Sequence, residues 1–356
     1  MAEGVHSSDI EVNDSFMRRA HELALLGAGQ VSPNPLVGCV IVKDGHIIGE
    51  GWHQRYGYAH AEVNAIESVK DKSMLKNAVV YVNLEPCAHT GKTPPCTDML
   101  CKYPIRKVII SNIDPNPLVA GKGIEKLIQN GIEVETGILE NEGAFLNRRF
   151  FTFIQHKRPY IILKWAETID GYIAREDYTS RWISHPLSRK LAHKWRSEED
   201  AVMVGTNTAL FDNPRLNVRD WKGRNPVRIV LDLDLKIPAG AHILDGTSPT
   251  IVFNKKINEV RNLVQYISID DSYDLIPQIL EKLYSQNIQS VIVEGGAMLL
   301  NTFIKKQMWD EARIFRSNIS FGKGLDAPVI KSSKIHKENL LNDELIVNYN
   351  TAFFMW

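Results

Sequence analysis

The chain has 356 residues, which is enough for two domains or for one large domain. Its 42 Lys and Arg residues balance 42 Asp and Glu residues, which argues against a broad basic surface for nucleic acid. Four cysteines are too few for a disulfide scaffold, and no apolar run approaches the roughly 20 residues of a membrane span. The first 14 residues are polar and lack the apolar core of a signal peptide. These features favour a cytoplasmic location.

The first apolar stretch predicts a helix that follows a loose leader, begins at Asp14 or Ser15 and ends at a pair of glycines. The rigid turn after it contains Asn34 between two prolines. Its amide is either a turn residue or a group that reads a base. Two apolar runs, 36–42 and 46–51, then flank an Asp-Gly pair, which is typical of a β-hairpin.

Two short segments carry residue types that bind metals. His60 comes just before a predicted helix at 61–69, and Cys87 follows a predicted strand. Cys96 follows two prolines and begins another helix, whose N-terminus stabilises a thiolate. One imidazole and two thiolates are a three-ligand set for Zn²⁺ that leaves one position for water. Glu62 is then free to act as the proton shuttle.

The spacing departs from the usual zinc-deaminase signature, His-x-Glu followed by Pro-Cys-x-x-Cys. Here the second cysteine comes nine residues after the first, and the loop between them contains His89 and Lys92, a donor pair suited to an anionic substrate. Strands at 78–84, 107–111 and 131–136 alternate with helices, which predicts an α/β sandwich with its site at the carboxyl ends of the strands.

A polar helical segment at 140–156 is expected to join this region to a second one. In the second region the patterns predict a helix at 186–196, capped by Ser184 or His185, and strands at 160–165, 201–205, 227–231, 250–253 and 290–293. The last of these strands runs into Glu294-Gly295-Gly296 and a helix at 297–305. That segment is either a phosphate site at a helix N-terminus or a plain turn of the chain.

Motifs in both regions resemble those of the bifunctional riboflavin-biosynthesis deaminase–reductases. In the first region they are Pro33-Asn34-Pro35-x-Val37-Gly38, His60-Ala61-Glu62, Leu84-Glu85-Pro86-Cys87, Lys92-Thr93-Pro94-Pro95-Cys96 and Asp114-Pro115-Asn116-Pro117. In the second region they are Thr168-x-Asp170-Gly171, Ser180-x-Trp182-Ile183, Asp212-Asn213-Pro214-x-Leu216 and Val293-Glu294-Gly295-Gly296. The long spacing between the two cysteines is itself a mark of this family. The resemblance extends from about Ser15 to Gly324.

The resemblance implies an α/β protein with a cytidine-deaminase-like α/β/α sandwich at 1–147, a linker at 148–158 and a dihydrofolate-reductase-like α/β domain at 159–356. The first domain would use zinc-bound hydroxide to hydrolyse the 2-amino group of 2,5-diamino-6-(5-phosphoribosylamino)pyrimidin-4(3H)-one. The second would use NADPH to reduce the ribosyl side chain of the product to ribityl. The implied partners are this small phosphorylated pyrimidine and further copies of the chain in a homo-oligomer, with no nucleic acid and no membrane.

The resemblance also implies site residues at the matching positions. The metal ligands would be His60, Cys87 and Cys96, and Glu62 would be catalytic. The deaminase pocket would be completed by Asn34, His53, His89, Lys92, Asp114 and Asn116. Substrate contacts in the reductase would come from Lys164, Ser180, Leu216, Arg219 and Glu294. Cofactor contacts would come from Ala166, Trp182, Thr208, Asp212, Gly296, Ala297, Met298, Leu299, Leu300, Asn301 and Thr302.

Two other interpretations share the zinc site. A nucleic-acid deaminase with an appended domain would need a basic channel, and the zero net charge and the long loop around Lys92 weigh against it. A zinc-stabilised binding protein would prefer a closed ligand set and would have no use for Glu62 as a spare carboxylate.

Overall fold

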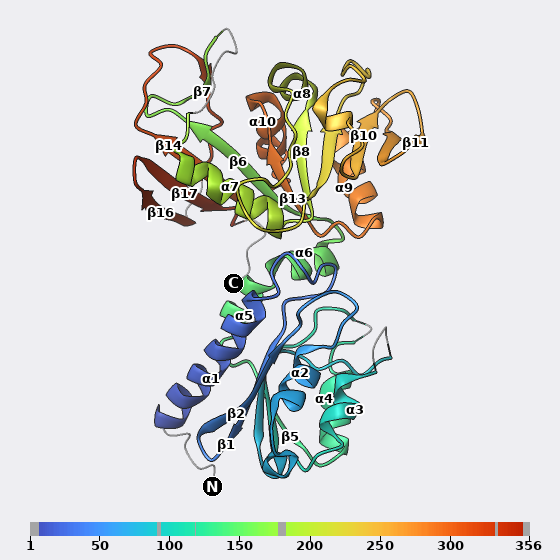
Figure 1. The fold of residues 1–356 in the computed structure, drawn as a ribbon, viewed down its shortest axis with the longest axis vertical. Coiled ribbons are helices and arrows are strands. Elements are labelled where there is room, and N and C mark those ends of the chain that lie inside the picture. Colours follow the sequence, from blue (N-terminus) through green and yellow to red (C-terminus); the bar gives the residue numbers. More distant parts are fainter. Residues whose placement is uncertain (1–6, 91–93, 118, 177–182, 332–333, 352–356) are drawn as a thin grey trace. The chain divides into compact units, whose positions relative to one another are not determined.

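The computed structural model describes residues 7–90, 94–117, 119–176, 183–331 and 334–351. The chain divides after His156 into two compact units, Met1–His156 and Lys157–Met355 (Figure 1). In the part of the chain that the structure describes, no helix combines the length and the apolar composition that crossing a membrane requires.

The N-terminal unit is an α/β structure built on one sheet. Its described strands are β1 (Gly38–Lys43), β2 (His46–Trp52), β3 (Val79–Leu84), β4 (Lys107–Asn112) and β5 (Glu133–Thr136). Its described helices are α1 (Ser7–Leu25), α2 (Ala61–Ser68), α3 (Cys96–Leu100), α4 (Lys122–Gln129), α5 (Glu140–Leu146) and α6 (Arg148–His156), with a 3-10 turn at Lys72–Leu75. The strand order is β2-β1-β3-β4-β5. β1 is antiparallel to β2, as the predicted hairpin requires, and also to β3, whereas β3, β4 and β5 are parallel to one another.

Alternating side chains give this sheet two apolar faces. Val40 and Tyr81 pack with Met17 of α1 on one face. Ile41 and Val80 pack with residues of α2, α3 and α4 on the other face. Helices therefore cover both faces, which is the α/β/α arrangement expected from the sequence. Figure 1 shows α1 on one side of the sheet and α2 on the other.

Two details of the N-terminal unit differ from the sequence prediction. Helix α1 already includes Ser7 and does not begin at Asp14 or Ser15. No Gly or Pro interrupts residues 7–15, so the helix can continue through them. The helical segment expected at 140–156 is divided at Asn147. The side-chain amide of Asn147 accepts a hydrogen bond from the Leu36 amide at 2.8 Å and donates one to the Leu36 carbonyl at 2.9 Å.

The C-terminal unit contains a larger mixed sheet. Its described strands follow the order β11 (Glu259–Arg261), β12 (Val264–Ser268), β10 (Thr250–Asn254), β9 (Val227–Leu231), β8 (Ala201–Gly205), β13 (Ser290–Glu294), β6 (Tyr160–Glu167), β14 (Glu311–Ser317), β17 (Asp343–Tyr349) and β16 (Lys334–Leu340). A separate short ladder pairs β7 (Tyr172–Ala174) with β15 (Leu325–Asp326). The described helices are α7 (Pro186–Glu198), α8 (Thr206–Asp212), α9 (Leu275–Ser285) and α10 (Ala297–Lys305), with a 3-10 turn at His242–Leu244.

Helices also cover both faces of this second sheet. Leu163 and Val293 pack with α9 and α10 on one face, whereas Ile162 and Phe315 pack with Trp195 of α7 on the other. Strands β9, β8, β13, β6 and β14 are parallel, so their carboxyl ends lie at one edge of the sheet. Polar residues that follow these strands can meet there.

Candidate active sites

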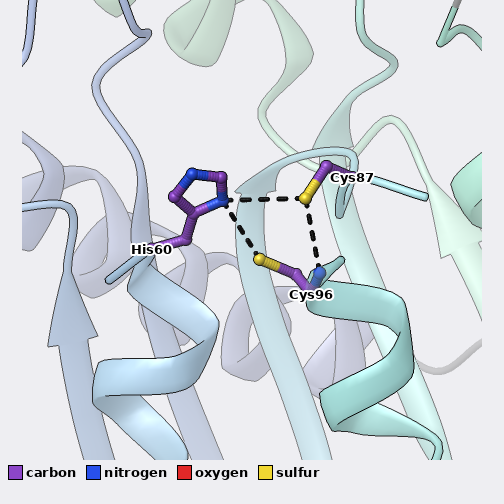
Figure 2. Close-up of side chains that lie close together, drawn as sticks. All are labelled: His60, Cys87 and Cys96. Atoms are coloured by element: carbon purple, nitrogen blue, oxygen red, sulfur yellow. Dashed lines mark hydrogen bonds between the residues drawn. The ribbon is translucent and has the colours of Figure 1, made fainter. Parts of the chain in front are cut away.

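Three metal-binding side chains of the N-terminal unit lie together, although they come from three different elements (Figure 2). His60 is the residue that precedes α2, Cys87 follows β3, and Cys96 is the first residue of α3. The His60 Nδ1 atom lies 3.2 Å from the Cys96 Sγ atom and 3.6 Å from the Cys87 Sγ atom. The backbone N–H of Cys96 donates to the Cys87 sulfur at 3.3 Å.

This geometry fits one zinc ion. Ligand atoms about 2.1 and 2.3 Å from a tetrahedral zinc ion stand roughly 3.6 Å apart. The separations of 3.2 and 3.6 Å around His60 Nδ1 are close to that value. The three ligand atoms lie within 4.8 Å of one another. Two sulfurs and one nitrogen are also the chemical donors that zinc prefers.

The protein lowers the pKa of one thiol before any metal binds. A hydrogen bond from the Cys96 thiol, supported by His60, outweighs burial and lowers the pKa of Cys87. A thiol must lose its proton to bind a metal, and the hydrogen bond that helps Cys87 to do so raises the pKa of the Cys96 thiol. Glu62, in the first turn of α2, is only 3% exposed, and this burial raises its pKa above the ordinary value.

A cavity of about 310 Å³ opens beside these residues. Most of the polar residues predicted for the deaminase pocket line it, and several aromatic residues complete its wall. The polar lining residues include Asn34, His53, His60, Glu62, Cys87, His89, Asp114 and Asn116, and the aromatic ones are Tyr56, Tyr58 and Phe150. Lys92 lies outside the described residues.

His53 fixes the direction in which the Asn34 amide points. The His53 Nδ1 atom lies 3.1 Å from the carbonyl oxygen of Ala59, so it must carry the proton and donate. The Nε2 atom then accepts a hydrogen bond from the Asn34 Nδ2 atom at 3.1 Å. The Asn34 Oδ1 atom is therefore the acceptor that this amide can offer to a ligand. Burial lowers the pKa of His53, which favours this neutral form.

Asp114 and Asn116 reach the cavity from the turn that follows β4. The Asp114 carboxylate accepts a hydrogen bond from the Asn116 amide at 2.8 Å. Burial raises the pKa of Asp114 to about 6, and the neighbouring Glu85 charge adds to this effect.

Glu85 is a functional candidate that the sequence analysis did not single out. It follows the last apolar residue of β3 and is only 4% exposed. Its carboxylate accepts hydrogen bonds from backbone amides of the segment that holds Asp114 and Asn116. A charged residue directly after the predicted strand at 78–84 was the signal in the sequence.

In the C-terminal unit, Lys164 and Glu294 are side by side on β6 and β13. The Lys164 Nζ atom lies 3.7 Å from a Glu294 carboxylate oxygen. Arg196 of α7 was not among the predicted site residues, and it donates to both Glu294 oxygens at 2.7 Å. Burial would raise the pKa of Glu294, but Arg196 and then Lys164 outweigh it and lower the pKa to about 2. Glu294 is therefore an ionised acceptor at neutral pH.

Among the other described reductase candidates, Thr208 lies in α8, and Leu216 and Arg219 lie between α8 and β9. The Thr208 hydroxyl, in α8, accepts a hydrogen bond from the Gly296 amide at 2.9 Å. Leu216 is buried and has a φ of 51°, a conformation that costs energy for a residue with a side chain. The Arg219 amide donates to the His193 ring at 3.5 Å.

The remaining predicted cofactor contacts are distributed over several elements. Ala166 is on β6, Asp212 ends α8, and residues 297–302 are in α10. Within α10, Met298 is 77% exposed, whereas Leu300 is fully buried in the core and can present only its backbone to a ligand. Ser180 and Trp182 lie outside the described residues.

Comparisons with known proteins match both units. The family model of the cytidine and deoxycytidylate deaminase zinc-binding region matches residues 10–112, and that of the RibD C-terminal domain matches residues 159–348. The riboflavin biosynthesis protein RibD of Aquifex aeolicus is 41% identical over 351 residues, which cover 95% of this chain and 98% of the relative. The Escherichia coli protein of the same name is 35% identical over 322 residues, which cover 85% and 87%.

A solved structure is similar to this chain over almost its whole length. It is a diaminohydroxyphosphoribosylaminopyrimidine deaminase/5-amino-6-(5-phosphoribosylamino)uracil reductase from Thermotoga maritima, with 40% sequence identity and a TM-score of 0.88. The similarity covers 96% of this chain and 99% of that chain.

The fold and the metal site therefore define a zinc-dependent deaminase of the cytidine deaminase type joined to a reductase. The chain belongs to the RibD family of riboflavin-biosynthesis proteins. It is a bifunctional enzyme, a deaminase and a reductase, with Zn²⁺ and NADPH as its cofactors. The nucleic-acid deaminase and the binding protein are not favoured, because the relatives match this chain across both units.

Proposed function

We propose that the N-terminal unit removes the 2-amino group of 2,5-diamino-6-(5-phosphoribosylamino)pyrimidin-4(3H)-one and that the C-terminal unit reduces the product's ribosyl group to ribityl. The observation that carries the first step is the triad of His60, Cys87 and Cys96 beside the buried Glu62 at one cavity. A small pyrimidine fits a cavity of about 310 Å³, which is the lower end of the usual range for ligand sites.

His60, Cys87 and Cys96 would hold the zinc ion in the deaminase. When bound, zinc supplies a Lewis acid that makes water acidic near neutral pH. Glu62 lines the same cavity and is assigned the proton transfers: it takes a proton from the attacking water and delivers it to the departing amine. The net reaction adds one water, breaks the carbon–nitrogen bond and releases ammonia.

The rest of the deaminase pocket is assigned to substrate binding. Asn34 would offer its Oδ1 atom to a ring or amino N–H group, since His53 already holds its Nδ2 atom. Asp114 and Asn116 line the same cavity from the segment that follows β4. His89, also in the lining, and Lys92 are assigned to the charged end of the substrate.

The reductase site is assigned to the edge where β6 and β13 end. NADPH supplies the hydride, so the protein must bind and orient both reactants. Glu294, held ionised by Arg196, would accept hydrogen bonds from ribosyl hydroxyls, and Lys164 would donate to ribosyl oxygens. Ser180, Leu216 and Arg219 complete the proposed substrate contacts. Cofactor contacts are assigned to Ala166, Trp182, Thr208, Asp212 and residues 296–302.

The proposal also includes the domain limits, the cellular location and the oligomeric state of the protein. We assign 1–147 to the deaminase, 148–158 to a linker and 159–356 to the reductase. The family match that begins at residue 159 supports the last limit. We expect a cytoplasmic homo-oligomer, and four free cysteines are in keeping with a reducing compartment. Light scattering on the purified protein would measure the oligomeric state.

A two-stage assay tests the proposed reactions. The zinc-loaded protein is given the diaminopyrimidine phosphate without NADPH, and ammonia is measured. NADPH is then added, and its absorbance is followed. Ammonia release followed by NADPH consumption is the expected result. Ammonia release with neither NADPH nor NADH consumed would refute the reductase assignment, and no ammonia release would refute the deaminase assignment.

A further inference from the structure

The carboxylate of Glu85 joins two loops that carry different parts of the deaminase site. Glu85 lies between β3 and the metal ligand Cys87, and its backbone N–H extends the pairing of β3 with β4 by donating to the Asn112 carbonyl at 2.9 Å. The side chain is only 4% exposed. A buried carboxylate is costly unless its oxygens are hydrogen-bonded, so its partners indicate its role.

All the hydrogen-bond partners of this carboxylate that the structure describes are backbone amides of one segment. One oxygen accepts from Asp114 at 3.2 Å and from Gly121 at 3.1 Å. The other accepts from Gly123 at 2.9 Å and from Ile124 at 3.4 Å. Both oxygens therefore act only as acceptors, as an ionised carboxylate does.

The four amides lie at the two ends of the segment that connects β4 to α4. Asp114 is at its beginning, and Gly123 and Ile124 are in the first turn of α4. Gly121 precedes this helix with a φ of 81° and supplies no side chain to cap it. Glu85 thus caps α4 from another part of the chain, and its negative charge is favourable at a helix N-terminus.

The segment before Cys87 and the start of α4 are in close contact. A Cβ atom on Gly123 would lie 2.1 Å from the Pro86 carbonyl oxygen and 3.1 Å from the Glu85 Oε1 atom. The start of α4 is therefore in direct contact with the residues that precede Cys87. Asp114 and Asn116, on the same segment, line the cavity together with Cys87 and Glu62.

We propose that Glu85 is a positioning residue of the deaminase, which sets the place of Asp114 and Asn116 relative to the metal ligands. This inference rests on the proposed function, in which Asp114 and Asn116 bind the pyrimidine. Glu85 also lines the cavity, but both its oxygens accept hydrogen bonds from backbone amides, and we assign it no proton transfer. Its removal should weaken substrate binding, because the binding loop shifts while the metal ligands remain in place.

The test uses the zinc-loaded full-length protein and the variants Glu85→Gln, Asp114→Ala, Asn116→Ala and Glu85→Gln combined with Asp114→Ala. In Glu85→Gln an NH₂ group replaces one oxygen and faces two amide donors, so we expect KM for the diaminopyrimidine to rise about 10- to 100-fold. We expect kcat to change less than KM, and zinc content to stay at one ion per chain. Hydrogen exchange at Asp114, Gly121 and Gly123 should become faster.

The double variant separates positioning from a general loss of stability. If Glu85 acts through the loop, the double variant should lose less than the sum of the two single losses, because the two changes partly remove one shared contribution. Additive losses would overturn the inference. Loss of zinc from Glu85→Gln would also overturn it, since the residue would then serve the metal site. Gly123→Ala, which displaces the same segment while retaining Glu85, should reproduce the rise in KM even if Glu85→Gln is poorly folded.

Two controls complete the test. Glu50→Gln makes the same chemical change in the same unit but breaks only a partly exposed pair with Arg19, so it should leave both activities unchanged. Reductase activity should be preserved in every variant. Normal KM in Asp114→Ala and Asn116→Ala would refute the proposed substrate site, and with it this inference. Raised KM in those variants but not in Glu85→Gln would refute the inference alone.

Discussion

At the residue scale, the deaminase site depends on a few side chains whose surroundings set their chemistry. Glu62 is buried beside the metal-binding triad, where its carboxylate can exchange a proton with a reacting group but has little contact with solvent. In the second unit, Arg196 holds the buried Glu294 in its ionised form. The surroundings of Glu294 therefore keep it ionised, whereas those of Glu62 leave it able to gain and lose a proton.

We expect Glu62→Gln to lower kcat for ammonia release by about 100- to 10,000-fold, because an amide cannot carry the proton. The change keeps the size of the side chain, so zinc content and reductase activity should be preserved. Ammonia release and NADPH consumption by the same preparation measure both effects. Wild-type rates of ammonia release would show that the role assigned to Glu62 is wrong.

At the element scale, close contacts between helices and strands hold the parts of the site together. Helix α1 packs on β1 so closely that a Cβ atom on Gly38 would lie 2.0 Å from the Ala20 carbonyl oxygen. The segment that follows α1 carries Asn34 into the cavity. The packing of α1 therefore determines where this side of the pocket lies.

We expect Gly38→Ala to destabilise the N-terminal unit by about 1–3 kcal/mol, because backbone atoms must move to accommodate the methyl group. The loss of stability is measured by chemical denaturation, with deaminase activity as the readout of the folded N-terminal unit. Gly240→Ala is a suitable control, since a Cβ atom there meets nothing within 4 Å. Equal stability of the two variants would mean that the α1–β1 contact adjusts without cost.

At the scale of the whole molecule, the chain carries two activities on two compact units with separate cores. The metal site uses residues of the first unit only, and the Lys164–Glu294 pair belongs to the second. The two activities should therefore respond differently when one cofactor is removed.

Removing zinc with a chelator should abolish ammonia release and preserve the NADPH-dependent reduction of the deaminated product. Added Zn²⁺ should restore ammonia release, because the ligand set is already assembled in the fold. Both rates can be measured on the same sample before and after dialysis. Parallel loss of the two activities would contradict the independence of the units.

Each unit also contains a buried histidine that should make its stability depend on pH. Burial lowers the pKa of His21 and of His193 to about 4. The unfolded chain, with a histidine pKa near 6.5, then binds more protons than the folded chain at intermediate pH. The stability contributed by each neutral histidine is complete above pH 6.5 and is lost as the pH falls toward 4.

Denaturation of wild type and His21→Asn at pH 7.5 and pH 4.5 tests this expectation for the N-terminal unit. The wild-type free energy of unfolding should fall more than that of the variant, by at most roughly 3 kcal/mol. His46→Gln changes an exposed histidine and should behave as wild type. Zinc release at low pH affects all three proteins and cancels in the comparison.

The sequence by itself determined the chemistry of the metal site and most of the elements that carry it. His60, Cys87 and Cys96 were identifiable because few other residue types bind zinc, and the apolar periodicity placed β3, α2 and α3 around them. The start of α1 was misplaced because residues 7–15 are mostly polar and give little periodic apolar signal.

Only the tertiary structure decided which polar groups meet. The side-chain hydrogen bonds of Glu85 join residues 29 to 39 positions apart, and the pairs between Arg196 and Glu294 join residues 98 positions apart. A local pattern cannot encode such partners, because they depend on strand order and on how each helix packs on its sheet. The same packing sets the tautomer of His53 and so the direction of the Asn34 amide.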